Sequence, residues 1–281
     1  MNDTAPPRRI WLCADDYGLS EGVNRAIRDL IGRGRLNATS AMVVGPAIGR
    51  DEVAALQSVA GNSPRCAIGL HATLTAPFRP LTMHFRPLDG GMFLGFPAML
   101  RAGFLRRLDP EIIHAELMVQ LSAFKELFGR APDFVDGHQH VQLFPQVRDA
   151  FLRAVKEAAP GAWVRQGGRE LPLAQRLGNP KALLLDLLSA QFRRRASRQG
   201  IASNPAFAGA YDFSGEPDFS ALMRQFLDGI PEGGLIMCHP GFVDEVLISL
   251  DPLTTQREHE HAYLAGEAFP RLLAVNKVTL G

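Results

Sequence analysis

The sequence predicts an α/β protein, a single-domain distorted (β/α) barrel of seven to eight mostly parallel strands. Apolar strand-like segments alternate with helical segments along most of the chain, which is the pattern of a parallel sheet. No GxGxxG or Walker loop follows the first strand, which argues against a nucleotide-binding doubly wound sheet. Polar residues follow several strands, at the end where the chemistry of a barrel gathers.

The first strand and helix are expected near the start of the chain. The apolar run "RIWLCA", Arg9–Ala14, predicts a buried strand. A helix over Glu21–Arg33 follows, with Ser20 as its N-cap and Gly34 just past its end, because hydroxyl side chains favour the first position and glycine the last.

Three further strands are expected at "ATSAMVVG", "RCAIGLHATL" and "DFVDGHQH". Between the last two lies the clearest helix, which Asp109 caps, Pro110 begins and Gly129 ends. The pattern then predicts strands at "AWVR", "AGAYDF", "GLIMCHPG" and "VTLG", with helices at Pro145–Glu157, Phe219–Leu227 and Glu258–Val275. No repeat or linker divides the chain, so we expect one domain over residues 1–281.

Composition narrows the classes of partner. The chain has 30 Lys+Arg against 29 Asp+Glu, so no global basic field would attract nucleic acid. Three separated cysteines without CxxC spacing and no apolar leader in "MNDTAPPRRI" predict a cytoplasmic protein. No run approaches the roughly 20 apolar residues of a membrane span. The sequence does not determine the oligomeric state, and a homo-oligomer is one of the alternatives.

Ligand-type side chains stand at the ends of three predicted strands. The first ends in Asp15 and Asp16, the third in His71, and the fourth in His138 and His140. Barrel strand ends share one face, so these residues should converge. Adjacent carboxylates repel unless a cation or a shared proton offsets them. One carboxylate with two imidazoles would hold a divalent cation and leave positions open for water and substrate.

Each of these residues also has a structural interpretation. A lone histidine at a strand end is often a hydrogen-bonded structural residue, and Asp15–Asp16 could form a turn that caps the next helix. His138 and His140 lie two apart on a predicted strand, so their side chains should share one face.

Four segments carry a family resemblance. In this order and spacing, "ADDYGLS", "IGLHATLT", "DGHQHVQLFP" and "MCHPGF" resemble the YdjC-type carbohydrate deacetylases. The segments "NPAFAGAYDFSG" and "TTQREHEHAYLAGEAFPRL" are most similar to the hopanoid-biosynthesis-associated branch. The resemblance implies a distorted (β/α) barrel and metal-dependent removal of N-acetyl groups from amino sugars. For this branch it implies an N-acetylglucosaminyl hopanoid glycolipid as substrate.

Carried over by position, the resemblance implies that Asp16, His71 and His138 are the metal ligands, with Asp15 the neighbouring carboxylate and His239 the late histidine. The chain departs from the family at Gln139 and Gln142, where further histidines are frequent; we expect a changed polarity on the substrate side near Gln142. Imidazole ligands favour Zn²⁺, and Mg²⁺ stays open.

The chemistry assigns provisional roles. Asp15 would act as general base and His239 as general acid, with His140 the alternative acid or a substrate contact. Arg165 at the end of the fifth strand and Tyr17 beside Asp16 are further substrate-binding candidates, although an arginine there is as often part of a surface ion pair.

Two basic amphipathic segments, Phe96–Leu108 and Lys181–Arg198, are either ordinary helices or elements that lie on a membrane and admit a lipid-linked sugar. Two rival functions remain open at this point. One is another metal hydrolase, a phosphoesterase or deaminase, and the other is a carbohydrate- or lipid-binding barrel without turnover.

Overall fold

A computed structural model describes residues 6–61, 66–168, 180–211, 215 and 217–281. Its centre is one sheet of seven strands, and every pair of neighbouring strands runs parallel. In spatial order these are β8 (Trp163–Val164), β7 (Phe134–Gly137), β4 (Ala67–Ala72), β3 (Ala38–Ala41), β2 (Trp11–Tyr17), β10 (Leu235–Cys238) and β9 (Phe207–Ala208). The predicted α/β class with a parallel sheet is confirmed.

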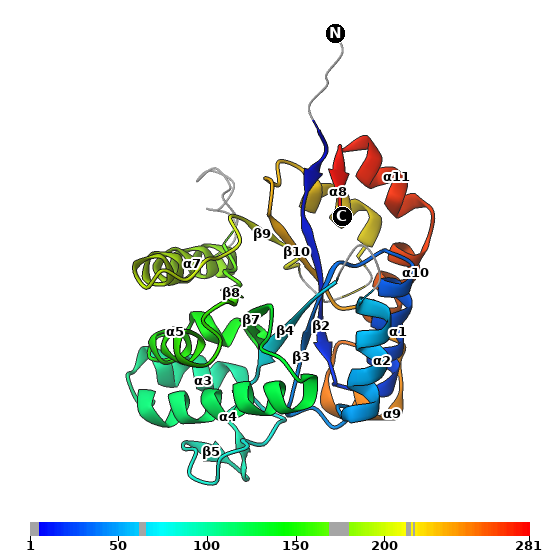
Figure 1. Cartoon of the computed structure of the whole chain (residues 1–281). Helices are drawn as coiled ribbons and strands as arrows, with labels where there is room; N and C mark the ends of the chain where they lie inside the picture. Colours follow the sequence, from blue (N-terminus) through cyan, green and yellow to red (C-terminus); the bar gives the residue numbers. More distant parts are fainter. Residues whose placement is uncertain (1–5, 62–65, 169–179, 212–214, 216) are drawn as a thin grey trace.

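The chain segment 202–208 joins the two edges of this sheet. The Val164 N–H in β8 donates to the Ala202 carbonyl over 2.9 Å, and Val164 forms a parallel bridge with Ser203. A few residues later Phe207 pairs with Leu235 of β10. The sheet therefore curls into a distorted (β/α) barrel, as the sequence predicts (Figure 1).

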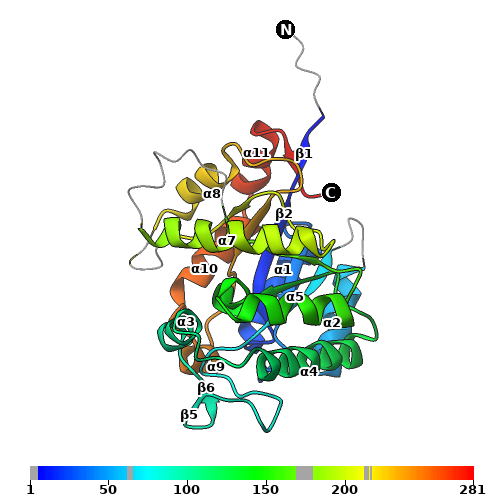
Figure 2. The same cartoon turned by 90° about the vertical axis from the view of Figure 1, so that its left-hand side faces the viewer.

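Helices cover the outside of the sheet (Figures 1 and 2). They are α1 (Glu21–Gly32), α2 (Arg50–Ala60), α3 (Phe96–Phe104), α4 (Pro110–Phe128), α5 (Val147–Ala158), α7 (Pro180–Arg198), α8 (Phe219–Leu227), α9 (Glu245–Leu250), α10 (Thr255–Ala265) and α11 (Ala268–Val275). The predicted caps are present: Ser20 Oγ accepts from the Val23 N–H, Asp109 from the Glu111 N–H, and Gly129 is left-handed at φ 68°. In the part of the chain that the structure describes, no helix is long and apolar enough to cross a bilayer.

A small aromatic cluster fills the barrel interior at the amino ends of the strands. Phe134 and Trp163 stack with ring centroids 4.5 Å apart, and Phe207, Leu235 and Met237 pack in the same cluster. A Cβ at Gly69 would lie 2.5 Å from the Phe134 ring, so this β4 position needs glycine. This cluster occupies the amino ends of the strands, and the buried polar residues Asp16, His71 and His138 lie at or just past the carboxyl ends.

Four local predictions are corrected. The final "VTLG" is not in the main sheet: β11 (Val278–Thr279) pairs with β1 (Arg8–Arg9) in a separate two-stranded sheet. The helix expected over Glu258–Val275 is two helices, which separate at Gly266. The strand expected at "AGAYDF" is the two-residue β9, and residues 212–214 lie outside the described residues.

The fourth correction concerns the fourth strand. It stops at Gly137 and enters the 3₁₀ segment η1 (His138–Leu143), because Gln139 and His140 have φ values of 54° and 57°. His138 and His140 therefore do not lie on one strand. The structure also adds α2, which the sequence did not predict, and a short hairpin of β5 (Leu88–Asp89) and β6 (Met92–Phe93).

Candidate metal centre

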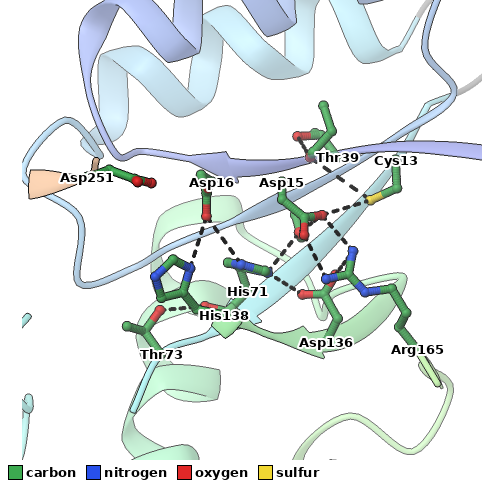
Figure 3. A network of polar contacts seen from close by, with 12 residues as sticks. Cys13, Asp15, Asp16, Thr39, His71, Thr73, Asp136, His138, Arg165 and Asp251 are labelled. Carbon is green, nitrogen blue, oxygen red and sulfur yellow. Dashed lines mark hydrogen bonds and ion pairs between the residues drawn. The ribbon is translucent and has the colours of Figure 1, made fainter. Parts of the chain in front are cut away.

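Asp16, His71 and His138 meet at the carboxyl ends of β2, β4 and β7 (Figure 3). The Asp16 Oδ1 atom lies 3.3 Å from His71 Nε2 and 3.1 Å from His138 Nδ1. The three donor atoms lie within 4.8 Å of one another, and all three side chains are buried. Asp16 turns toward the histidines with a left-handed φ of 69°, which aspartate tolerates better than most residues.

The surroundings of His71 fix the orientation of its ring. Its Nδ1 atom lies 2.6 Å from Asp136 Oδ1 and 3.1 Å from Ser40 Oγ, so Nε2 faces Asp16. Burial by itself would lower the pKa of His71, but the Asp136 and Asp15 carboxylates outweigh it and raise that pKa to about 10. A carboxylate behind a ligand histidine is the usual support of a metal site.

A cavity of about 340 Å³ opens over these three residues. One carboxylate oxygen and two imidazole nitrogens, set in an open cavity, fit a divalent cation with coordination positions left for water and substrate.

Asp15 lines the same cavity as Asp16 and is paired with Arg165 (Figure 3). Both of its oxygens accept hydrogen bonds from the Arg165 guanidinium, at 2.6 and 2.7 Å. Burial would raise the pKa of Asp15, but Arg165 and His71 hold it well below its usual range. Arg165 also lies 3.0 Å from Asp136. Asp15 is thus an ionised carboxylate beside the candidate metal centre (Figure 3).

A second buried arginine, Arg257 of α10, holds Asp16. Its Nη2 donates to Asp16 Oδ2 over 2.6 Å and to Asp251 Oδ2 over 2.7 Å, and its Nε donates to the Leu253 carbonyl. Burial would raise the pKa of Asp16, but Arg257 and the two histidines keep it well below its usual value. Because Arg257 occupies Oδ2, Oδ1 is the oxygen that faces His71 and His138.

Sequence reasoning missed Arg257. For Asp136 it left two interpretations open, a hydrogen-bond partner of a ligand histidine or a residue that ends the strand, and the structure has Asp136 hydrogen-bonded to His71. Arg257 lies in "TTQREHEHAYLAGEAFPRL", one of the two branch-like segments, and a buried arginine inside a run of charged residues has no signature of its own. Asp136 stands two residues before His138, and its partner His71 lies 65 residues away in sequence.

His239 follows β10 and lines the same cavity. Its backbone N–H donates to Glu260 Oε2 over 2.5 Å, and Glu260 also accepts from the Tyr211 hydroxyl at 2.6 Å. Burial raises the pKa of Glu260. His140 lines the cavity too, edge-on to Phe207 at 5.3 Å. Burial, together with Arg165, lowers the pKa of His140 to about 3, so its imidazole is neutral near pH 7.

The remaining predicted residues lie around the cavity or beneath it. Arg165 lines the cavity, but its guanidinium is engaged by Asp15 and Asp136. Tyr17 is buried outside the cavity lining, where its hydroxyl donates to the Glu52 carboxylate. Gln142 is also buried and donates to the Arg165 carbonyl. The departure from the family pattern at Gln142 therefore lies under the site and not on the substrate side.

Fold and site together define a class: a distorted parallel (β/α) barrel with an Asp–His–His centre and an adjacent ionised carboxylate at its carboxyl end. Within that class the chain belongs to the YdjC-like protein family, which matches residues 9–275.

Two relatives are chitooligosaccharide deacetylases. The one from Citrobacter koseri is 31% identical over 254 residues, which cover 85% of this chain and 84% of the relative. The one from Escherichia fergusonii is 31% identical over 286 residues, which cover 97% and 91%.

Solved structures show the same fold. A protein from Enterococcus faecalis V583, described as a candidate cellobiose-phosphate cleavage protein, superposes with a TM-score of 0.72 at 20% identity and covers 98% of this chain and 97% of its own. A lactam utilization protein from Thermus thermophilus superposes with a TM-score of 0.50 at 17% identity, over 97% and 98% of the two chains.

Proposed function

We propose that this protein is a metal-dependent carbohydrate N-deacetylase, which hydrolyses the acetamide of an N-acetylated amino sugar to a free amine and acetate. The observation that carries the proposal is the cluster of Asp16, His71 and His138 beside an ionised Asp15 in one cavity. The names of the two relatives at 31% identity support the same reaction.

Asp16 Oδ1, His71 Nε2 and His138 Nδ1 would hold the divalent ion. When bound, such an ion lowers the pKa of a water and polarises a carbonyl. Zn²⁺ is the preferred candidate because two of the three ligands are imidazoles, and Mg²⁺ is the alternative.

Asp15 would accept the proton of the attacking water, whose oxygen bonds to the acetyl carbon as the carbon–nitrogen bond breaks. Arg165 keeps this carboxylate ionised and fixed in place. A proton donor on the side of the amide opposite Asp15 must then protonate the departing amine. His239 is the preferred donor, because the low pKa of His140 leaves that ring without the extra proton near pH 7.

Product analysis tests the reaction class. Purified protein should release acetate from N-acetylglucosamine oligomers or glycosides, and a chelator should abolish the release. Ammonia release would indicate a deaminase, and phosphate release from phosphate esters a phosphoesterase. Binding of sugars without any product would indicate a binding barrel.

For the finer substrate we propose a lipid-linked amino sugar, an N-acetylglucosaminyl hopanoid, met at the cytoplasmic face of a membrane. The branch-like segments support this, as do two helices on the same side of the barrel, α3 and α7 (Figure 1). Phe104 on α3 is 48% exposed and Leu187 on α7 is 57% exposed, and arginines accompany both. Each arginine near an anionic surface contributes about 1 kcal/mol.

Vesicle binding tests this finer proposal. Replacement of Arg106, Arg107, Arg193 and Arg194 by Gln should weaken binding to anionic liposomes and slow glycolipid turnover. Hydrolysis of a short soluble N-acetylated sugar should stay the same, since these arginines do not line the metal cavity. Equal effects on both substrates, or none on either, would contradict the membrane contact.

A further inference from the structure

Asp251 is a carboxylate at the cavity that the proposed mechanism does not use. Among the described residues that line the cavity over the metal centre, three carry a carboxylate: Asp15, Asp16 and Asp251. Asp16 is a predicted metal ligand, and Asp15 is the proposed proton acceptor. The side chain of Asp251 is 18% exposed, whereas those of Asp15 and Asp16 are 3% and 2% exposed. Of the three, Asp251 is therefore the carboxylate most accessible to a ligand.

The local sequence holds the backbone of Asp251 in place. Helix α9 ends at Leu250, and Asp251 is extended at φ −140° and ψ 130°. This is the conformation expected before Pro252, because proline disfavours the helical region in the residue that precedes it. The Asp251 N–H donates to the Leu247 carbonyl over 2.9 Å. The Asp251 side chain therefore leaves the end of α9 at a fixed point beside the cavity.

Two hydrogen bonds fix the carboxylate itself. Its Oδ1 atom accepts from the Leu253 N–H over 2.8 Å, and its Oδ2 atom accepts from Arg257 Nη2 over 2.7 Å. A carboxylate can accept about four hydrogen bonds, so each oxygen can accept one more. A group that is already held in one position loses little entropy when it binds a ligand. Asp251 is thus a preorganised acceptor for a hydrogen-bond donor in the cavity.

Asp251 lies next to the metal centre. The same nitrogen atom, Arg257 Nη2, also donates to Asp16 Oδ2 over 2.6 Å, so the two carboxylates lie within two hydrogen-bond lengths of each other. Figure 3 shows the Asp251 carboxylate pointing toward Asp16. An acetamide at the metal centre therefore brings the groups on the neighbouring ring carbons close to Asp251. In a β-glycoside of N-acetylglucosamine, the hydroxyl on the carbon next to the acetamido carbon is the 3-hydroxyl.

We propose that Asp251 binds the 3-hydroxyl of the amino sugar and thereby selects substrates with a free hydroxyl beside the acetamide. The proposal rests on the proposed function and deepens it by naming a specificity-determining residue. A sugar hydroxyl that leaves water needs a partner in the protein, and a charged acceptor forms a stronger hydrogen bond than a neutral one. The other two carboxylates are engaged: both oxygens of Asp15 accept from Arg165, and Asp16 faces Arg257 and two histidines.

The methyl β-glycoside of N-acetylglucosamine and its 3-deoxy analogue test this contact. In wild-type protein, kcat/KM for acetate release should be about 10- to 100-fold higher with the 3-hydroxyl than without it. Asp251→Ala should remove most of this preference. Asp251→Asn should remove less of it, since an amide oxygen still accepts a hydrogen bond. The 6-deoxy analogue, which is altered away from the acetamide, should show no dependence on Asp251.

A purely structural role of Asp251 gives a different result. If Asp251 only holds Arg257, its loss weakens the support of Asp16 and lowers kcat/KM for both glycosides by the same factor. Asp244→Ala is the matched control, because this carboxylate caps α9 in the same segment and lies outside the cavity lining. The control should keep the wild-type ratio between the two glycosides. The same ratio in Asp251→Ala would overturn the proposal.

Binding without turnover separates this proposal from the proposed reaction. Calorimetric titration of Asp15→Asn, which lacks the proton acceptor, should show the same preference for the 3-hydroxyl, and addition of Asp251→Ala should remove it. If this preference is found while wild type releases no acetate, the contact is correct and the proposed reaction is wrong. Acetate release without a preference, or no binding of either glycoside, would overturn the contact.

Discussion

Asp15 and Asp16 are neighbours in sequence and line the same cavity, yet their surroundings differ. Asp15 gives both oxygens to a single arginine, Arg165. Asp16 gives only Oδ2 to Arg257 and turns Oδ1 to two histidines. Each carboxylate thus has its own buried cation, but of the two only Asp16 keeps an oxygen directed toward both His71 and His138.

This difference indicates how two adjacent carboxylates can coexist in a buried site and still do different chemistry. A buried charge is tolerated when it is paired and hydrogen-bonded. The pair with Arg165 uses the Asp15 carboxylate fully, which suits a charge held in place beside a reaction. The pair with Arg257 uses half of Asp16, which suits a metal ligand.

The largest effect should come from removal of the charge of Asp16. Asp16→Asn should lower divalent metal affinity by at least about a hundredfold and abolish acetate release, since the only carboxylate among the three ligands is lost. Elemental analysis after dialysis against a weak chelator measures this. A variant that keeps its full metal content would show that Asp16 is not a ligand.

The matched change in the neighbouring carboxylate is Asp15→Asn. Metal content should stay at the wild-type level, while kcat falls about 10²- to 10⁴-fold because the proton acceptor is gone. If Asp15→Asn loses its metal and Asp16→Asn does not, the roles of the two carboxylates are exchanged. If turnover survives, Asp15 is a structural partner of Arg165.

The two arginines sharpen the comparison further. Arg165→Met and Arg257→Met each leave a carboxylate buried without its cation, so each should lower the free energy of unfolding by about 3–5 kcal/mol. Arg257→Met should weaken metal binding more, by about 10- to 100-fold, because Arg257 contacts the predicted ligand Asp16 directly whereas Arg165 reaches His71 only through Asp136. Denaturant unfolding and metal titration calorimetry measure the two effects separately.

A milder pair of variants covers the case in which the methionine variants do not fold. Arg165→Lys and Arg257→Lys keep the positive charge but lose the planar guanidinium. The same ranking of metal affinities is expected, with smaller losses of stability. Equal metal affinities for the two lysine variants would contradict a separate role for Arg257.

The sequence was sufficient for much that depends on neighbours in the chain. The helix ends lie where they were predicted: Ser20 and Asp109 cap the starts of two helices, and Gly129 ends one of them. Capping involves residues within one turn of the helix, so the local sequence is enough to predict it. The meeting of Asp16, His71 and His138 followed from parallel strands, whose carboxyl ends share one edge. Their roles as ligands stay a prediction until metal binding is measured.

The pairing of the two arginines with the two carboxylates could not be predicted from the sequence, because the partners are far apart along the chain. Arg165 lies 150 residues from Asp15, and Arg257 lies 241 residues from Asp16. Nothing local shows that either arginine is buried. The turn at Gln139 and His140 was missed for another reason: neither residue type demands a left-handed backbone, so the segment resembled a continued strand.

The smallest expected effect is a pH dependence that comes from His71 and not from the Asp15–Arg165 pair. In metal-free protein the pKa of His71 is about 10, against about 6.5 in an unfolded chain. A raised histidine pKa stabilises the folded state fully below about pH 6.5, and this contribution is lost as pH rises toward 10. Arg165 keeps its charge and Asp15 stays ionised over the same range, so their pair should contribute no slope.

Denaturant unfolding of chelator-treated protein between about pH 6 and about pH 9 measures this dependence. The free energy of unfolding should fall as pH rises in wild type, and His71→Gln should remove most of the fall because the titrating ring is gone. His259→Gln, at an exposed position of α10, is the matched control and should keep the wild-type slope. A slope that survives in His71→Gln would show that the Asp136 and Asp15 carboxylates do not hold a proton on His71. The contrast between Asp15 and Asp16 would then lie in hydrogen-bond geometry alone.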